Sequence, residues 1–197
     1  HSYSPDAIPF DIVAPRLTQL NLSGTTHPLF PPLSPLLVLK FLEYYYLDNH
    51  LLDTVLQRLL QDNSSLKQLE LSNVKFLINP QFENAHNLET LVLRGASLAT
   101  LNILSSHAPR LKTIDGMCFT LSQHSQPQLA IGCPLLSTVQ VETEVLEGVE
   151  LSECESLIEL YCRCPRMGNL DLAESSRLSI VDIQSPLLHE VTLIRSE

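Results

Sequence analysis

Apolar residues recur along this chain in one short pattern. Two leucines three positions apart are followed, two positions later, by a third apolar residue, and the clearest copies begin at Leu17, Leu66 and Leu88. In the last third of the chain, copies follow each other at steps of 10 or 11 residues, beginning at Leu136, Leu146, Leu157, Met167, Leu178 and Leu188. The last two apolar positions of each copy are two residues apart, the period of a β-strand, so their side chains face the same way. The pattern therefore predicts a series of short strands separated by turns.

The length of the repeat indicates how these strands are arranged. A unit of 10 or 11 residues is too short to enclose a core, whereas two units make 21 residues, inside the range of roughly 20–29 residues of a leucine-rich repeat. We therefore expect two extended segments per coil, one on the concave face and one on the back. A small residue and a proline introduce five copies, at Pro15, Pro109, Pro134, Pro165 and Pro186. Proline fixes φ and lacks an N–H, so it suits a coil corner and not a strand interior.

Helical spacing of apolar residues occurs in one stretch, residues 48–61, which we expect to form a helix on the convex side. Residues 27–35 hold four prolines and are predicted to be a loop, and the repeat decays in an irregular insertion over residues 116–132. The expected fold is α/β: one domain over residues 1–197, a solenoid of about eight coils. Its concave face carries a parallel β-sheet, and its back is mostly β-structure near the C-terminus.

These repeats resemble the leucine-rich-repeat superfamily and, within it, the repeats of F-box/leucine-rich-repeat proteins. The segments that carry the resemblance are residues 14–24 (APRLTQLNLSG), 63–77 (NSSLKQLELSNVKFL) and 164–172 (CPRMGNLDL). The resemblance implies a substrate receptor, in which a separate F-box recruits a ubiquitin ligase, although no segment here resembles an F-box. Bacterial effector proteins use similar solenoids. The alternative function is therefore a free-standing bacterial effector or regulator that binds and modulates another protein.

Composition narrows the class of partner. Twelve basic and 22 acidic residues give a formal charge of −10, which would repel a nucleic-acid backbone or an anionic membrane, so we expect neither as a partner. The apolar stretches end well before the ~18 residues that a membrane-spanning helix needs. The five cysteines, Cys118, Cys133, Cys154, Cys162 and Cys164, are odd in number and crowded into the last eighty residues. This arrangement favours a reducing, cytoplasmic compartment, which would be a host cytoplasm for a bacterial effector.

Residues typical of catalysis or cofactor binding form no recognisable constellation. The six glycines are scattered singly, so no phosphate-binding loop is predicted. Cys162 and Cys164, with Cys154, could offer thiolates to zinc, but no histidine lies close in sequence, and we expect these side chains to pack in coils. A nucleophile would need a histidine base and a carboxylate nearby. We therefore expect no metal, no cofactor and no enzyme activity, and keep a hydrolase with a site at a coil corner as the remaining hypothesis.

The concave face is the expected binding surface, because alternate side chains of its strands point outward on a rigid frame. Tyrosine and arginine, which are enriched in interface hot spots, occur among them. The expected partner-binding residues are Lys40, Glu70, Arg94, Asp115, Glu142, Glu159, Tyr161, Arg163 and Asp182. Two further candidate surfaces are the acidic run from Glu142 to Glu159, suited to a basic partner, and the tyrosines at positions 44–46.

The final coil ends on apolar residues. Leu188, Val191, Leu193 and Ile194 lie within ten residues of Glu197, with no polar cap behind them. Terminal repeats of solenoids normally present a polar outer face. We therefore expect this end to be covered by further sequence, by a second copy or by the partner; the pattern does not fix the oligomeric state.

Overall fold

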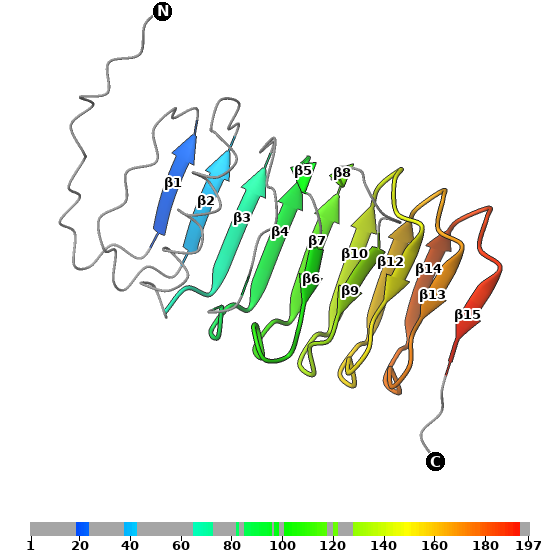
Figure 1. Ribbon diagram of the computed structural model, residues 1–197. Helices are drawn as coiled ribbons and strands as arrows, with labels where there is room; N and C mark the ends of the chain where they lie inside the picture. Colours follow the sequence, from blue (N-terminus) through cyan, green and yellow to red (C-terminus); the bar gives the residue numbers. More distant parts are fainter. Residues whose placement is uncertain are drawn as a thin grey trace, which may run out of the picture.

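The computed structural model describes residues 19–23, 38–42, 65–72, 82, 85–95, 97–98, 101–117, 120–121 and 128–193. These residues form a parallel β-solenoid, whose strands stack side by side along one axis around a common apolar core (Figure 1). Every strand pairing among them is parallel. The parallel arrangement follows from the repeat, because each coil brings the chain back in the same direction.

The largest sheet has eight strands, each of five residues. In spatial order these are β1 (Gln19–Ser23), β2 (Val38–Leu42), β3 (Gln68–Ser72), β4 (Thr90–Arg94), β7 (Thr113–Met117), β10 (Thr138–Glu142), β12 (Glu159–Arg163) and β14 (Ile180–Gln184). One strand per coil on this face is what the repeat predicts. The phase holds across residues 116–132, because β7 and β10 are direct neighbours with Thr113 opposite Thr138.

Shorter strands form the second side of the solenoid. In spatial order they are β15 (Glu190–Thr192), β13 (Asn169–Asp171), β11 (Gly148–Glu150), β9 (Gln128–Ile131) and β6 (Leu101–Ile103). A third, two-stranded sheet joins β5 (Ser97–Leu98) to β8 (Thr120–Leu121). Five turns therefore have both of their main strands within the described residues, which confirms the prediction of two extended segments per coil for that part of the chain.

Tight turns connect the two main sheets in both directions. In four of them a small residue followed by proline accepts a hydrogen bond from the N–H three positions later, as in Ala108 to Leu111 (3.1 Å), before β7, and Cys164 to Met167 (3.0 Å), before β13. Proline occupies the second position of these turns, where its fixed φ is favourable and its missing N–H is not needed. The predicted coil corners are thus confirmed at Pro109, Pro134, Pro165 and Pro186; Pro15 lies outside the described residues.

The core consists of columns of inward side chains stacked from turn to turn. One column runs through Leu69, Leu91, Ile114, Val139 and Leu160, all of which are buried. Each side chain packs against the turns on both sides of its own. The hydrophobic contribution to stability, about 25 cal/mol per Å² of buried apolar surface, is therefore shared between neighbouring turns.

Several sequence predictions lie outside the described residues, namely the helix at 48–61, the loop at 27–35 and the tyrosines at 44–46. The described ranges contain strands and turns but no helix. The number of coils and the concavity of the large sheet stay predictions. Among the residues whose structure is given, no helix is long and apolar enough to cross a bilayer.

Candidate protein-binding face of the eight-stranded sheet

Strand alternation sorts the side chains of the large sheet into inward and outward columns. In β3, β7 and β10 the second and fourth residues are buried, and the first, third and fifth are partly exposed. The register aligns the third residues into one central column: Asn21, Lys40, Glu70, Val92, Asp115, Gln140, Tyr161 and Asp182.

All nine predicted binding residues occupy outward register positions of this one sheet. Five lie in the central column, Arg94, Glu142 and Arg163 lie at the carboxyl ends of their strands, and Glu159 begins β12. For Lys40, only the register position is described. Arg94 and Tyr161, which were both predicted to lie on the binding face, are on the same sheet: Arg94 is the fifth residue of β4, and Tyr161 is the third residue of β12.

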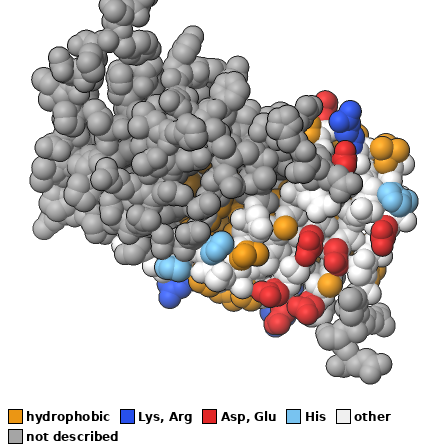
Figure 2. All heavy atoms as spheres, viewed as in Figure 1, with side chains coloured by type: hydrophobic (Ala, Val, Ile, Leu, Met, Phe, Trp, Pro, Cys, Tyr) orange, Lys and Arg blue, Asp and Glu red, His pale blue; other side chains and the backbone are white. Residues whose placement is uncertain are grey.

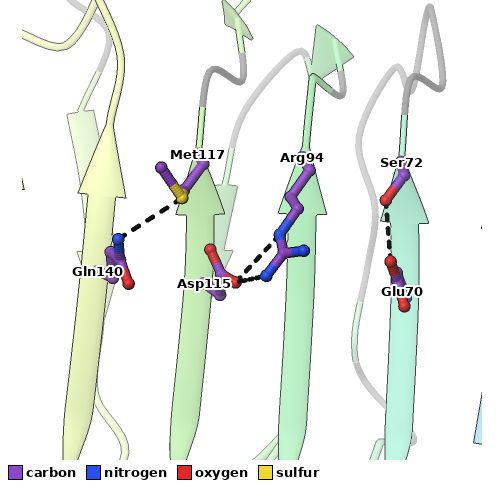
Figure 3. A network of polar contacts seen from close by, with 6 residues as sticks. All are labelled: Glu70, Ser72, Arg94, Asp115, Met117 and Gln140. Carbon is purple, nitrogen blue, oxygen red and sulfur yellow. Dashed lines mark hydrogen bonds and ion pairs between the residues drawn. The ribbon is translucent and has the colours of Figure 1, made fainter.

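An arginine–aspartate pair lies near the middle of the face. Arg94 donates from Nε to Asp115 Oδ2 at 3.2 Å, and its Nη2 contacts the same oxygen (Figure 3). This hydrogen bond, followed by the Coulombic attraction, raises the pKa of Arg94. Asp115 Oδ1 is buried and has no hydrogen-bond partner. The carboxylate therefore uses one oxygen, and the other keeps an unused capacity to accept a hydrogen bond.

Beside this ion pair, the amide of Gln140 makes only a weak hydrogen bond. Gln140 donates from Nε2 to the sulfur of Met117 at 3.5 Å, and a thioether is a weak acceptor (Figure 3). Val92, which lies opposite Asp115 in the register, is only 7% exposed and adds an apolar element to the column. The centre of the face thus combines a charged pair, a loosely held amide and an apolar contact.

A second cluster surrounds Tyr161 on β12. Tyr161 lies opposite Gln140 on one side and Asp182 on the other, and its side chain is partly exposed. Arg163 lies 4.0 Å from Glu142, both with exposed side chains, so their pairing is weak and both can turn to a partner. Tyrosine and arginine beside each other on a rigid sheet are typical of interface hot spots.

A charge ladder that sequence reasoning missed runs along the edge where the strands begin. Glu89 binds Lys67 at 3.1 Å and Lys112 at 2.7 Å. Its hydrogen bond with Lys112, and then that with Lys67, lowers the pKa of the Glu89 carboxyl group. All three residues directly precede a strand in successive turns, and this shared repeat position is the signal that would have found them.

The acidic run predicted as a second surface is not one patch. Glu142 and Glu159 lie on the large sheet, Glu150 lies on β11 of the small sheet, and the remaining members lie in the turns between them. The run encircles one turn of the solenoid. Its carboxylates are therefore divided between different faces of the molecule.

The described cysteines pack into the core as free thiols. Burial raises the pKa of Cys133 to about 12 and those of Cys154 and Cys164 to about 11. Cys154 Sγ points at the Ile131 carbonyl oxygen, 3.5 Å away. Because a thiolate is the reactive form, these thiols are poor nucleophiles near neutral pH. Among the described residues, no group of three or more His, Cys, Asp and Glu side chains is arranged to hold a metal ion.

Comparison with known proteins finds no matching family model, no matching curated protein and no matching solved structure. The likeness to F-box/leucine-rich-repeat proteins therefore rests on the repeat segments themselves and stays a prediction. The geometry of the sheet faces is the remaining basis for a functional proposal.

Proposed function

We propose that this chain is a non-catalytic interaction module that binds a protein partner on the outward face of its eight-stranded sheet. The observation that carries the proposal is the row of in-register outward side chains from Glu70 to Asp182, with the half-used Asp115 carboxylate near its centre. Such a row offers a partner charge, hydrogen bonds and an aromatic ring on a frame that need not rearrange.

The chemistry of the face suggests how recognition works. An N–H donor from the partner would satisfy Asp115 Oδ1 once the side chains around it shift. Tyr161 supplies a large contact area with little loss of conformational entropy, and Arg163 can form a two-point contact with a partner's carboxylate. Mixed charge on the face selects a partner of complementary pattern and steers its approach.

The finer features predicted from the sequence belong to the same proposal: a leucine-rich-repeat solenoid of about eight coils, whose large sheet is concave. In this setting the chain is the substrate-recognition part of a ubiquitin-ligase receptor in the cytoplasm. The resemblance of residues 14–24, 63–77 and 164–172 to F-box/leucine-rich-repeat proteins supports it. The alternative, a bacterial effector that regulates a host protein, uses the same face, and the identity of the partner distinguishes the two.

The test is affinity capture from a cell lysate, followed by affinity measurement with the purified partner. A Tyr161→Ala/Arg163→Glu double variant removes an aromatic anchor and reverses a charge on the face. We expect its affinity to fall about a thousandfold, because two hot-spot residues that each contribute about 2 kcal/mol together contribute about 4 kcal/mol.

A matched control makes equivalent changes away from the face. Leu135 and Arg177 are exposed in turns, so the Leu135→Ala/Arg177→Glu variant should bind like the wild type. Far-UV circular dichroism and thermal melts must show that both variants fold equally well. If the Tyr161/Arg163 variant keeps the partner at wild-type affinity, binding on this face is wrong.

A further inference from the structure

The five-stranded sheet has an outer face of its own, and this face contains a hollow. Two outward columns line it: Gln128, Gly148, Asn169 and Glu190 in the first, and Glu150, Asp171 and Thr192 in the second. Gly148 has no side chain, so the first column is interrupted between Gln128 and Asn169. The result is a depression of about 210 Å³, large enough for a side chain from another molecule.

The walls of this hollow are acidic. Glu150, Asp171 and Glu190 contribute carboxylates, and neither lysine nor arginine is among the lining residues. The ion pairs found among the described residues lie outside this hollow, at Glu89, Asp115 and Glu142. Figure 2 shows acidic side chains gathered over the C-terminal part of the described molecule.

Two of the carboxylates are direct neighbours on the sheet. Glu150 lies opposite Asp171 on the adjacent parallel strand, where strands are about 4.8 Å apart. Like charges in directly opposed positions destabilise a sheet, and a cation placed between them removes this repulsion. One carboxylate oxygen of Asp171, Oδ1, already accepts a hydrogen bond from the Ala173 N–H at 2.9 Å. Glu150 and Glu190 are exposed and can turn toward a ligand.

We propose that the outer face of the five-stranded sheet docks an extended basic peptide segment, with a lysine or arginine side chain seated in the hollow beside Gly148. The carbon stem lies beside the Gln128 side chain, which covers Gly148, and the charged end reaches Glu150, Asp171 and Glu190. Charge complementarity identifies the partner class, since the chain as a whole carries a formal charge of −10. This face lies on the opposite sheet from the one proposed above, so either proposal can fail without the other.

The probe for the test is a fluorescently labelled seven-residue peptide of alternating lysine and threonine, with a glutamate–threonine peptide as its acidic counterpart. Fluorescence anisotropy with the full chain should show saturable binding of the lysine peptide alone. The Glu150→Gln/Glu190→Gln variant should bind it about tenfold more weakly, because it loses two partly exposed charge pairs. Asp171 is left unchanged, because its carboxylate also holds a turn.

Two further variants separate docking from a diffuse attraction. Glu144→Gln/Glu155→Gln removes the same charge from exposed turns outside the hollow and should change affinity less than twofold. Gly148→Val keeps every charge but takes up part of the hollow, and the atoms nearest to its Cβ are those of the Gln128 side chain, at 3.4–3.7 Å. We expect about tenfold weaker binding from it as well. Equal weakening by the two charge variants, unchanged binding by Gly148→Val, or binding of the acidic peptide would each overturn the proposal.

Discussion

Two turns of the solenoid with the same sequence pattern differ sharply in burial. In the turn of β12 and β13, Leu160 is 0% exposed and Leu170 is 1% exposed. Their register partners in the last described turn, Val181 on β14 and Val191 on β15, are 49% and 45% exposed. All four residues are apolar and occupy inward positions of the repeat. The difference arises because the first turn has described neighbours on both sides and the last has one on one side only.

This contrast shows that the unit of stability is the contact between turns. An inward apolar side chain of one turn is fully buried only when the following turn packs against it. The same trend continues beyond the second sheet, where Leu172 is 4% exposed and the equivalent Leu193 is 67% exposed. Strands β14 and β15 are also the edges of their sheets, so their outer backbone groups have no ladder partner within the described residues.

The largest expected effect on the free energy of unfolding comes from replacing an inward valine with alanine, which can be done both in a buried turn and in the last described turn. Val139 on β10 is 0% exposed and belongs to the same inward column as Val181. Val139→Ala should lower the free energy of unfolding by about 2 kcal/mol, because it removes two buried methyl groups and leaves a cavity. Val181→Ala should cost less than about 1 kcal/mol, since half of that side chain is already exposed.

Urea unfolding followed by circular dichroism measures both losses. Thr138→Ser, which lies on the same strand but points outward, serves as a control for changes in β10 itself. Equal losses for Val139→Ala and Val181→Ala would contradict the difference between the two turns, and would indicate that the last turn is covered in solution.

A second expected effect concerns the thiols, which occupy interior turns and are replaced in the last one. Ile183 takes the register position of Cys162, and Ser185 takes that of Cys164. Burial raises the pKa of Cys133 from 9.0 to about 12 and that of Cys154 from 9.0 to about 11. The unfolded chain therefore releases these protons at lower pH than the folded chain does. Stability is fully present below pH 9.0 and declines as the pH rises toward 11.

The expected loss is about 1 kcal/mol per buried thiol between pH 8 and pH 10. Urea unfolding of the wild type and of a Cys133→Ala/Cys154→Ala variant at the two pH values measures it. The two substitutions can also change the free energy of unfolding at pH 8. Between pH 8 and pH 10, however, the free energy of unfolding should fall by about 2 kcal/mol less in the variant than in the wild type. Parallel pH profiles would mean that these thiols are accessible in the folded state.

The sequence was sufficient to predict features that each repeat contains within itself. The alternation of apolar and polar residues in segments such as 66–71 predicted the strands and their inward faces. The small residue before Pro109 or Pro134 predicted the turns. Both signals depend on residues at most a few positions apart. The common phase of β10, β12 and β14 could be predicted because these strands begin 21 residues apart, and such a regular spacing leaves few ways to stack them.

Features that depend on contacts between turns were not predicted. Lys67, Glu89 and Lys112 are more than twenty residues apart, and only the register brings them together. Gly148 was one of several single glycines in the sequence, and it forms a hollow because Gln128 and Asn169 occupy the positions on either side. The buried, unpartnered oxygen of Asp115 likewise depends on the side chains of neighbouring strands.

The smallest expected effect is a gain in the free energy of unfolding from relieving backbone strain at Glu153 and at Glu174, and it should be equal at the two positions. Glu153 and Glu174 lie 21 residues apart at equivalent turn positions, and both adopt positive φ, 54° and 71°. Asparagine tolerates this left-handed region better than glutamate does, so Glu153→Asn and Glu174→Asn should each raise the free energy of unfolding by about 0.5 kcal/mol. Glu155→Asn, in an exposed turn position without positive φ, should give no gain in the same urea titration. Because backbone strain does not depend on the following turn, the two gains should match; a gain at Glu153 alone would mean that the terminal turn does not hold its conformation in solution.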